Sequence, residues 1–352
     1  MRFLNALALS LAAGFALTPA LGAEAVVKPR VVSEPVRHDS DDPAIWINRA
    51  DPAQSLVLGT DKDAEGALYV FDLQGRIVQD KVVRGLLRPN NVDVAYDVDV
   101  GGAKVDVVVV AERYAHRLRV FRLPDMAPID GGGIEVFAGE RARDVMGIAL
   151  YTRPTDGSLF AIVSRSDRFA PQQGYLHQYR LADDGTGMLR GVFTRAFGQW
   201  SGLKEIEAIA VDDAAGYVYY SDETYGVRQY HADPLAEDAE EQLGEFGRGE
   251  FAEDHEGISV YARDDGTGYL LVSDQQANHF NVYPREGNSA AAPFARTLLA
   301  RIAVDTDESD GSDLTTVELP GFPGGLFVAM STNKTFQFYA VQDLLQAAGL
   351  PE

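Results

Sequence analysis

The sequence contains no cysteine, so neither a disulfide bond nor a thiolate metal site holds its fold together. It has six histidines but no His-Glu-x-x-His pair, which argues against a zinc protease. It also lacks a Gly-x-Ser-x-Gly elbow and a Gly-x₄-Gly-Lys loop, the marks of α/β-hydrolases and of P-loop nucleotide sites. A hydrophobic core must therefore stabilise the fold, and any metal site must be built from oxygen ligands.

Positive charge is also scarce, because 31 Lys and Arg residues face 53 Asp and Glu residues and the net charge is −22. Nucleic acids and anionic membranes bind clustered basic groups, so we expect neither as a partner. The acidic residues are clustered at 39–42, 61–63, 222–223, 253–256 and 305–313. Two explanations stay open at this point: solubility of the protein, and binding of divalent cations.

Only the N-terminus has the character of a targeting segment. Arg2 precedes an apolar run over residues 6–17, and small residues at 20–23 resemble a cleavage site. We therefore expect residues 1–23 to be a signal peptide and the protein to be exported, to the periplasm or the medium. A transmembrane anchor is the alternative, but the apolar run is short for a membrane span.

A short pattern, one residue followed by an apolar β-prone run, recurs six times at spacings of about 50 to 60 residues, the repeat length of propeller blades. The copies are Asp42-Pro-Ala-Ile-Trp, Asn91-Val-Asp-Val-Ala-Tyr, Met146-Gly-Ile-Ala-Leu-Tyr, Glu207-Ala-Ile-Ala-Val, Glu256-Gly-Ile-Ser-Val-Tyr and, most weakly, Thr315-Thr-Val-Glu-Leu. Four of the six leading residues offer a side-chain oxygen. If the repeats are radial blades, these oxygens meet at one rim of a central channel.

Each repeat continues with two more apolar segments separated by turn residues. The second strands are expected at 56–58, 105–110, 159–163, 217–220, 269–272 and 326–329, and the third, read as half-buried strands, at 67–71, 118–123, 176–181, 227–230, 280–283 and 336–339. The pattern predicts an all-β, six-bladed β-propeller with three or four strands per blade. A β-sandwich does not explain a sixfold repeat.

The whole of residues 24–352 is expected to form this single domain. Residues 26–36 can add an outer strand to the last blade and so close the ring, and residues 341–348 are expected to form a short terminal helix that ends at Gly349.

Several motifs together resemble the β-propeller phytases over nearly the whole chain, from about Glu34 to Tyr339. They are Asp41-Asp-Pro-Ala-Ile-Trp, Gly59-Thr-Asp-Lys, Asn90-Asn-Val-Asp, Glu207 with Asp212-Asp, Asp254-His-Glu-Gly and Ser273-Asp-Gln. The resemblance implies a six-bladed propeller that needs several calcium ions and removes phosphate from inositol hexakisphosphate.

The resemblance also implies roles for particular residues. Glu207, Glu223, Asp254 and Glu256 look like the acidic wall that holds catalytic calcium ions. Asp42 and Gln275 look like further ligands, and structural or rim calcium sites are implied for Glu34, Asp41, Asn91, the carbonyl of Val92 and Asp310. Lys62 and Arg113 look like the cations that hold the scissile phosphate.

These roles agree with the charge of the chain, because calcium ions let a densely anionic substrate approach an acidic protein and acidify the water that attacks phosphorus. The substrate is then a small molecule, an inositol phosphate taken as its calcium complex, and we expect a monomer.

Five places depart from the family pattern, one of them Met330-Ser-Thr, which replaces a Gln-Asp-Gly stretch. Met146 replaces a tyrosine, Asp63 replaces a lysine, and Thr315 replaces an acid. A phosphate-binding lysine has no counterpart in the segment 164–168, where Arg165 and Arg168 are the candidate substitutes. Two other functions therefore stay open: a catalytically weak or silent propeller that binds a ligand or partner, and a calcium-dependent sugar-lactone hydrolase.

Overall fold

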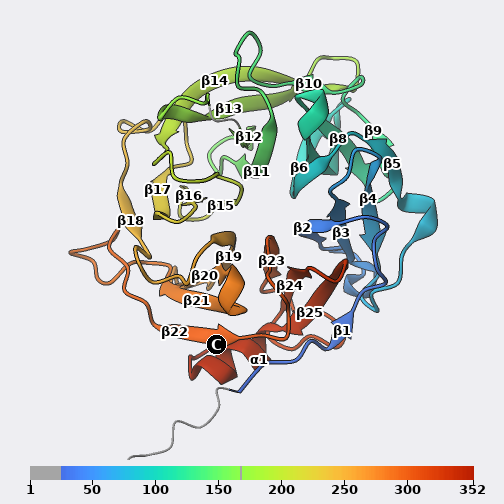
Figure 1. Cartoon of the computed structure of the whole chain (residues 1–352). Helices are drawn as coiled ribbons and strands as arrows, with labels where there is room; N and C mark the ends of the chain where they lie inside the picture. The colour runs from blue at the N-terminus through green and yellow to red at the C-terminus, as the bar shows by residue number, and fades with distance from the viewer. Residues whose placement is uncertain (1–24, 167–168) are drawn as a thin grey trace, which may run out of the picture.

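The computed structural model describes residues 25–166 and 169–352; the expected signal peptide, Asp167 and Arg168 lie outside the described residues. In this part of the chain the strands form six antiparallel sheets arranged in a ring around a central axis (Figure 1). Five sheets have four strands and one has five. This arrangement is a six-bladed β-propeller and confirms the predicted fold class.

The blades follow one another along the chain, and each begins with its innermost strand. Blade 1 contains β2 (Ser40–Trp46), β3 (Leu56–Asp61), β4 (Gly66–Phe71) and β5 (Val83–Leu86). Blade 2 contains β6 (Pro89–Val100), β7 (Ala103–Glu112), β8 (Arg117–Leu123), β9 (Ala127–Pro128) and β10 (Ile134–Glu135). Blade 3 contains β11 (Val145–Thr152), β12 (Leu159–Arg165), β13 (Gln173–Asp183) and β14 (Leu189–Gln199).

Blade 4 contains β15 (Ile209–Asp212), β16 (Tyr217–Asp222), β17 (Gly226–His231) and β18 (Gly244–Phe246). Blade 5 contains β19 (His255–Ala262), β20 (Gly268–Asp274), β21 (His279–Pro284) and β22 (Ala300–Ala303). Blade 6 contains β23 (Ser312–Thr315), β24 (Leu326–Ser331), β25 (Thr335–Ala340) and, as its outermost strand, β1 (Val31–Val32).

The two ends of the described chain close the ring. β1 pairs antiparallel with β25, with Val31 opposite Phe338, as the sequence predicted. The helix α1 (Val341–Ala348) follows β25 and ends at Gly349, whose φ of 66° is a left-handed conformation that glycine adopts readily. Within the described ranges no helix is long and apolar enough to cross a membrane.

The hydrophobic core is divided among the junctions between neighbouring blades. Strand β7 shows why: Val107 and Val109 pack with blade 3, whereas Val108 and Val110 pack with blade 1. Because both faces of such a strand are covered, its sequence is a continuous apolar run and does not alternate. Six junctions of this kind hold the ring together without disulfide bonds.

The expectation that the third strands are half-buried was wrong for most blades. β4, β17, β21 and β25 are buried almost throughout, including their polar residues. Those polar groups form hydrogen bonds inside the protein: Gln229 Oε1, for example, accepts from Arg296 Nη1 at 2.6 Å. Polar and apolar residues alternate along these strands because their two faces are buried in different surroundings, and not because one face is in solvent.

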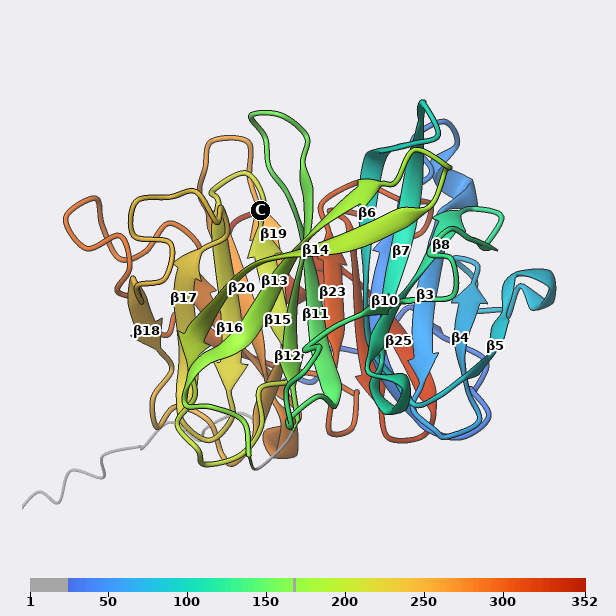
Figure 2. The same ribbon diagram turned by 90° about the horizontal axis from the view of Figure 1, so that it is seen from above.

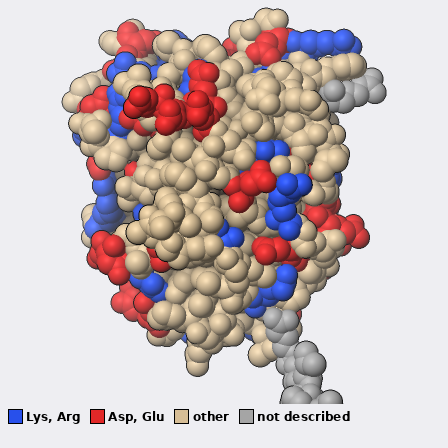
Figure 3. Space-filling view, turned by 90° about the vertical axis from the view of Figure 1, so that its left-hand side faces the viewer, with Lys and Arg blue, Asp and Glu red and all other residues tan. Residues whose placement is uncertain are grey.

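The long hairpins β6–β7 and β13–β14 project on one face of the ring (Figure 2), where Asp183 accepts a hydrogen bond from the Gly101 amide at 2.7 Å. The end of β7 that carries Arg113 is at the opposite face. Acidic and basic side chains lie in small mixed groups on the outer side shown in Figure 3, so the negative charge is not spread evenly there.

Candidate active site

One backbone hydrogen bond recurs in all six blades and defines a mouth of the ring. The amide after the second strand donates to a carbonyl on the segment that leads into the first strand. The six pairs are Lys62 to Asp39 (2.7 Å), Arg113 to Arg88 (3.0 Å), Ser166 to Asp144 (2.7 Å), Glu223 to Glu205 (3.1 Å), Gln275 to Asp254 (3.2 Å) and Thr332 to Asp307 (3.1 Å). The donor residues therefore occupy equivalent positions around one mouth.

In each blade, the innermost strand pairs with the second strand in a continuous register that starts at one residue. The residue two positions before that start belongs to an inner ring of side chains. This ring consists of Asp41, Asn90, Met146, Glu207, Glu256 and Asp310. The repeat read from the sequence had placed Asp42, Asn91 and Thr315 at these positions, which was wrong. The inner-ring residue lies within a pairing irregularity in blades 1, 2, 3 and 5. In blades 1 and 2 two like residues adjoin there, Asp41-Asp42 and Asn90-Asn91, and the sequence does not show which of them faces the mouth; Thr315 is the last residue of β23. Five of the six positions, not four, carry a side-chain oxygen.

The inner ring is joined by direct contacts. Asn90 Nδ2 donates to Glu207 Oε1 at 3.1 Å and to Asp41 Oδ2 at 3.4 Å. Lys62 Nζ lies 2.6 Å from Asp41 Oδ1 and 3.3 Å from Asp310 Oδ2. Gln275 Nε2 donates to Asp310 Oδ1. Residues from blades 1, 2, 4, 5 and 6 thus meet in one network.

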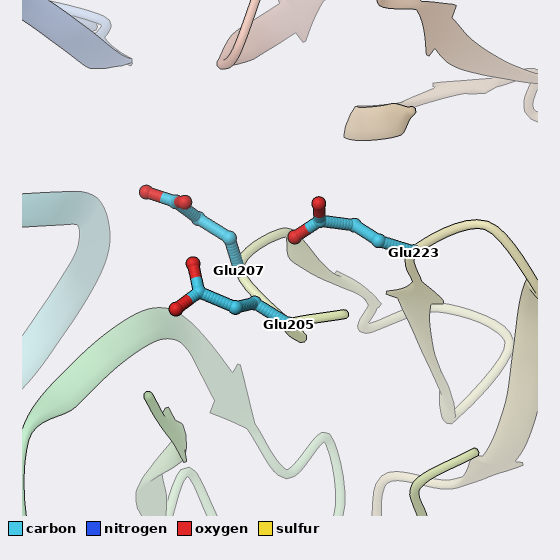
Figure 4. A group of neighbouring side chains, drawn as sticks. All are labelled: Glu205, Glu207 and Glu223. Carbon is cyan, nitrogen blue, oxygen red and sulfur yellow. The ribbon is translucent and has the colours of Figure 1, made fainter. Parts of the chain in front are cut away.

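Carboxylates gather on the side of blade 4. Ligand oxygens of Glu205, Glu207 and Glu223 all lie within 4.8 Å of one another (Figure 4). The sequence pointed to Glu207 and Glu223 but not to Glu205. The signal was present, because residues two apart in an extended segment share a face, and Glu205 is two residues before Glu207.

Burial makes these carboxylates costly to ionise in the absence of a cation. It raises the pKa of Glu207 to about 8 and that of Glu223 to about 7, and it raises the pKa of Glu256 well above its usual range. Asp310, also buried, has a pKa raised to about 7. The negative charges of neighbouring acids add to the effect at each group.

Some of the buried oxygens also lack hydrogen-bond partners within the described residues. They include Glu256 Oε2, Glu223 Oε1 and Asn90 Oδ1. Unpaired buried acceptors and clustered carboxylates are the donor set that a hard divalent cation requires. The residues present therefore fit a metal ion, and most of the carboxylates lie on the side of the mouth formed by blades 4 and 5.

The opposite side of the mouth carries cations. Arg113 Nη2 donates to Ser166 Oγ at 2.8 Å, and Ser166 Oγ donates to Glu205 Oε1. Arg165, a candidate substitute for the missing lysine, does not reach this place: it is fully buried and binds Glu140 and the carbonyls of Tyr175 and Gly174. That expectation was wrong. Ser166 occupies the equivalent position in blade 3, and Arg168 lies outside the described residues.

The remaining predicted residues lie inside the channel or away from it. Asp42, Asn91 and Val92 line a channel cavity of about 170 Å³, where Asp42 Oδ2 accepts from the Val92 amide at 3.1 Å and ties blade 1 to blade 2. Glu34 lies near the outermost strand β1, and its carboxylate accepts from the Ile77 amide at 2.6 Å. The structure does not bring Glu34 to the mouth.

Two further residues at the mouth were not anticipated. Lys204 Nζ lies 2.8 Å from both Glu223 Oε2 and Asp254 Oδ2. Gln276 exchanges hydrogen bonds with Asp254, donating to Oδ2 at 3.1 Å and accepting from the backbone amide at 2.8 Å. Neither residue belongs to a repeated motif, so the sequence contained no signal for them.

Comparison with known proteins adds to this geometry. The 3-phytase of Bacillus subtilis (strain 168) is 27% identical over 329 residues, which span 88% of this chain and 81% of that protein. Two solved structures match at 12% identity. A Dos1 propeller has a TM-score of 0.44 over 86% of this chain and 68% of its own, and the Kuenenia stuttgartiensis hydrazine synthase has 0.47 over 85% and 83%. Neither carries the fold assignment, which depends on the sheet order of this chain.

A family model described as Phytase matches residues 6–342, nearly the full length, and it includes every motif on which the sequence resemblance was based. The chain belongs to the phytase family.

Proposed function

We propose that the protein hydrolyses phosphate monoesters of inositol hexakisphosphate with calcium ions bound at the acidic side of the mouth. Family membership makes it a phosphoric monoester hydrolase with a small-molecule substrate. One observation carries the detailed proposal: equivalent backbone positions hold Lys62 and Arg113 on one side of the mouth and Glu223 and Gln275 on the other.

The acidic side supplies the ligands for the metal. Those best placed are Glu205, Glu207, Glu223, Asp254, Asp310, Asp41 and Gln275, which share the contacts described above, and Glu256, the inner-ring residue of blade 5. A calcium ion held there neutralises phosphate charge and makes a water molecule more acidic. Calcium suits this site because it accepts many oxygen ligands in a flexible geometry.

The cationic side binds the phosphate that is removed. The planar guanidinium of Arg113 can donate two parallel hydrogen bonds to phosphate oxygens, and Ser166 and Glu205 hold it in orientation. Lys62 has three donors, of which Asp41 and Asp310 engage two, so a third remains for the substrate. Water attacks phosphorus opposite the ester oxygen and the bond between phosphorus and that oxygen breaks. The inositol oxygen takes up a proton from solvent and leaves as a hydroxyl group. No covalent enzyme intermediate is needed.

The wall carboxylates accept the proton that the attacking water loses. With a cation bound, Glu207 and Glu223 are ionised and lie on the side of the mouth facing Arg113. Their burial excludes bulk water, which strengthens each electrostatic contact.

The deciding experiment measures inorganic phosphate released from inositol hexakisphosphate by the purified chain, first with calcium and then with a chelator. We expect release only with calcium. Absence of release in both conditions would contradict the proposal; lactone cleavage would then indicate the sugar-lactone hydrolase, and inactivity on both substrates a binding module.

We propose further that the protein is exported, to the periplasm or the medium, as a monomer without residues 1–23. N-terminal sequencing of the protein from each fraction tests the export and the cleavage. Light scattering on a sizing column tests the oligomeric state, and a dimer mass would refute the monomer.

A further inference from the structure

Two lysine side chains each lie between two carboxylates that are proposed metal ligands. Lys62 lies between Asp41 and Asp310, and Lys204 lies between Glu223 and Asp254 at 2.8 Å from each. Lys62 belongs to the phosphate-binding side of the mouth. Lys204 is on the opposite side, among the carboxylates, and has no role in the mechanism above.

The carboxylates that Lys204 contacts are held in place. The side chain of Glu223 is 1% exposed, and its amide is tied to the Glu205 carbonyl. Asp254 is 17% exposed and is bound through its amide and its carboxylate to Gln276. Neither acid can move far without breaking these contacts.

The backbone of Lys204 is also held, whereas its side chain is held only through its ammonium group. The Trp200 indole donates to the Lys204 carbonyl at 2.9 Å, and Ser201 is hydrogen-bonded to Asp222 next to Glu223. These contacts keep the lysine stem beside the acidic wall. The side chain itself is 42% exposed, and within the described residues its ammonium group contacts only Glu223 and Asp254, so it can swing out into solvent.

An ammonium group and a divalent cation cannot both occupy the oxygens of Glu223 and Asp254. Two positive charges a few ångströms apart repel strongly in a partly buried site. We propose that Lys204 is an internal counter-cation that competes with the metal ion for Glu223 and Asp254, a role that rests on the proposed function of the acidic wall. It stabilises the metal-free wall and raises the calcium concentration needed to load it.

The competition is tested by calorimetric titration of metal-free protein with calcium chloride, with no substrate present. Lys204→Met keeps the length of the stem but removes the charge. We expect the apparent dissociation constant of this variant for calcium at Glu223 and Asp254 to fall about tenfold, because no ammonium group occupies the ligand oxygens before calcium binds. In chelator its melting temperature should fall below that of the parent protein. Lys204→Arg should restore both values toward the parent.

Lys104→Met is the matched control, because Lys104 also pairs with a carboxylate at 2.8 Å, on Asp99, but lies at the far end of β7 from Arg113. It removes the same charge from the protein and should leave calcium binding unchanged. If Lys204→Met does not fold, Lys204→Gln, which can still donate hydrogen bonds to both acids, takes its place.

The sign of the change separates this role from a purely structural one. Damage to the wall weakens calcium binding, whereas removal of a competitor strengthens it. Unchanged or weaker binding in the variant, equal tightening in Lys104→Met, or no calcium binding by any of the proteins overturns the proposal. Phosphate release by the parent protein is measured separately, so tighter binding in an inactive protein would refute the proposed function and leave the competition standing.

Discussion

Blades 1 and 2 carry cations at a backbone position where blade 4 carries a carboxylate and blade 5 a neutral amide. Lys62 and Arg113 follow the second strand in the first pair of blades, and Glu223 and Gln275 follow it in the second pair. The backbone is nearly symmetric, but the chemistry is not. A propeller can thus bring an anion site and a cation site face to face by changing one residue per blade.

The two sides also differ in how well their charges are compensated. Lys62 is already paired with two acids, whereas Glu207, Glu223 and Glu256 have raised pKa values because burial and mutual repulsion oppose their ionisation. The acidic side therefore depends on an added cation far more than the basic side depends on an added anion.

The largest effect is expected from changes to the acidic side. Glu207→Gln and Glu256→Gln keep the side-chain size but remove the charge that binds the ion. Phosphate release should fall on the order of 100-fold or more, as for the loss of a main electrostatic group in an active site. Circular dichroism should show an unchanged fold, and Glu318→Gln, an exposed acid, should have parent activity. Parent rates in both wall variants would mean that the active centre lies elsewhere.

Loss of Arg113 should reduce activity with little effect on the metal, whereas Lys62 also pairs with Asp41 and Asp310, two of the proposed ligands. Arg113→Ala and Lys62→Ala each lose contacts to the phosphate, and we expect kcat/KM to fall roughly 10- to 100-fold, as for loss of a charge-assisted hydrogen bond of about 1.5–3 kcal/mol. The rise in melting temperature on adding calcium should be nearly that of the parent for Arg113→Ala. If that rise disappears, Arg113 supports the metal site and the two sides are not separate.

Calcium removal should destabilise the protein, and the loss should grow with pH. An ion that binds only the native state stabilises it by about 2.7 kcal/mol per site at a hundred times its dissociation constant. In chelator, Glu207 and Glu223 have native pKa values of about 8 and about 7, above those of the unfolded chain, so the native state binds more protons. Stability then falls as pH rises from about 5 to 8.

Melting temperatures measured across this pH range, with calcium and with chelator, check the effect. The curve in calcium should be the flatter one, because the bound ion compensates the ionised carboxylates. Parallel curves would show that these acids are ordinary surface charge.

The ring and its closure could be predicted from the sequence because they depend on apolar runs at a regular spacing. The β1–β25 pair and the helix α1 were confirmed for the same reason. The sequence did not show which residue of blades 1 and 2 belongs to the inner ring, because Asp41-Asp42 and Asn90-Asn91 are adjacent like residues within a pairing irregularity.

Side-chain direction was the other limit. Arg165 and Ser166 are adjacent, yet the arginine points into the protein toward Glu140 and the serine points toward the mouth. The positive charge of arginine favours Arg165 as a phosphate ligand, and only the direction of its side chain from the strand excludes it. Lys204 and Gln276 are recognised only from the three-dimensional contacts, since neither belongs to a repeated motif and their partners are about 20 residues or more away along the chain.

The smallest effect concerns blade 3, which has no charge at either ring position and separates the two sides. Its inner-ring residue Met146 is 2% exposed and offers no hydrogen bond. Met146→Tyr adds a hydroxyl group that can donate to a phosphate oxygen, which is worth about 1 kcal/mol, and kcat/KM should rise about fivefold. Met146→Phe adds the ring without the hydroxyl group, and its kcat/KM should not exceed that of the parent.

Because a larger side chain in a buried position can cost stability, melting temperatures of both variants are measured together with the rates. Equal rates in the tyrosine and phenylalanine variants would show that blade 3 does not contact the substrate, and would leave the contrast between blades 1–2 and blades 4–5 as the whole of the binding site.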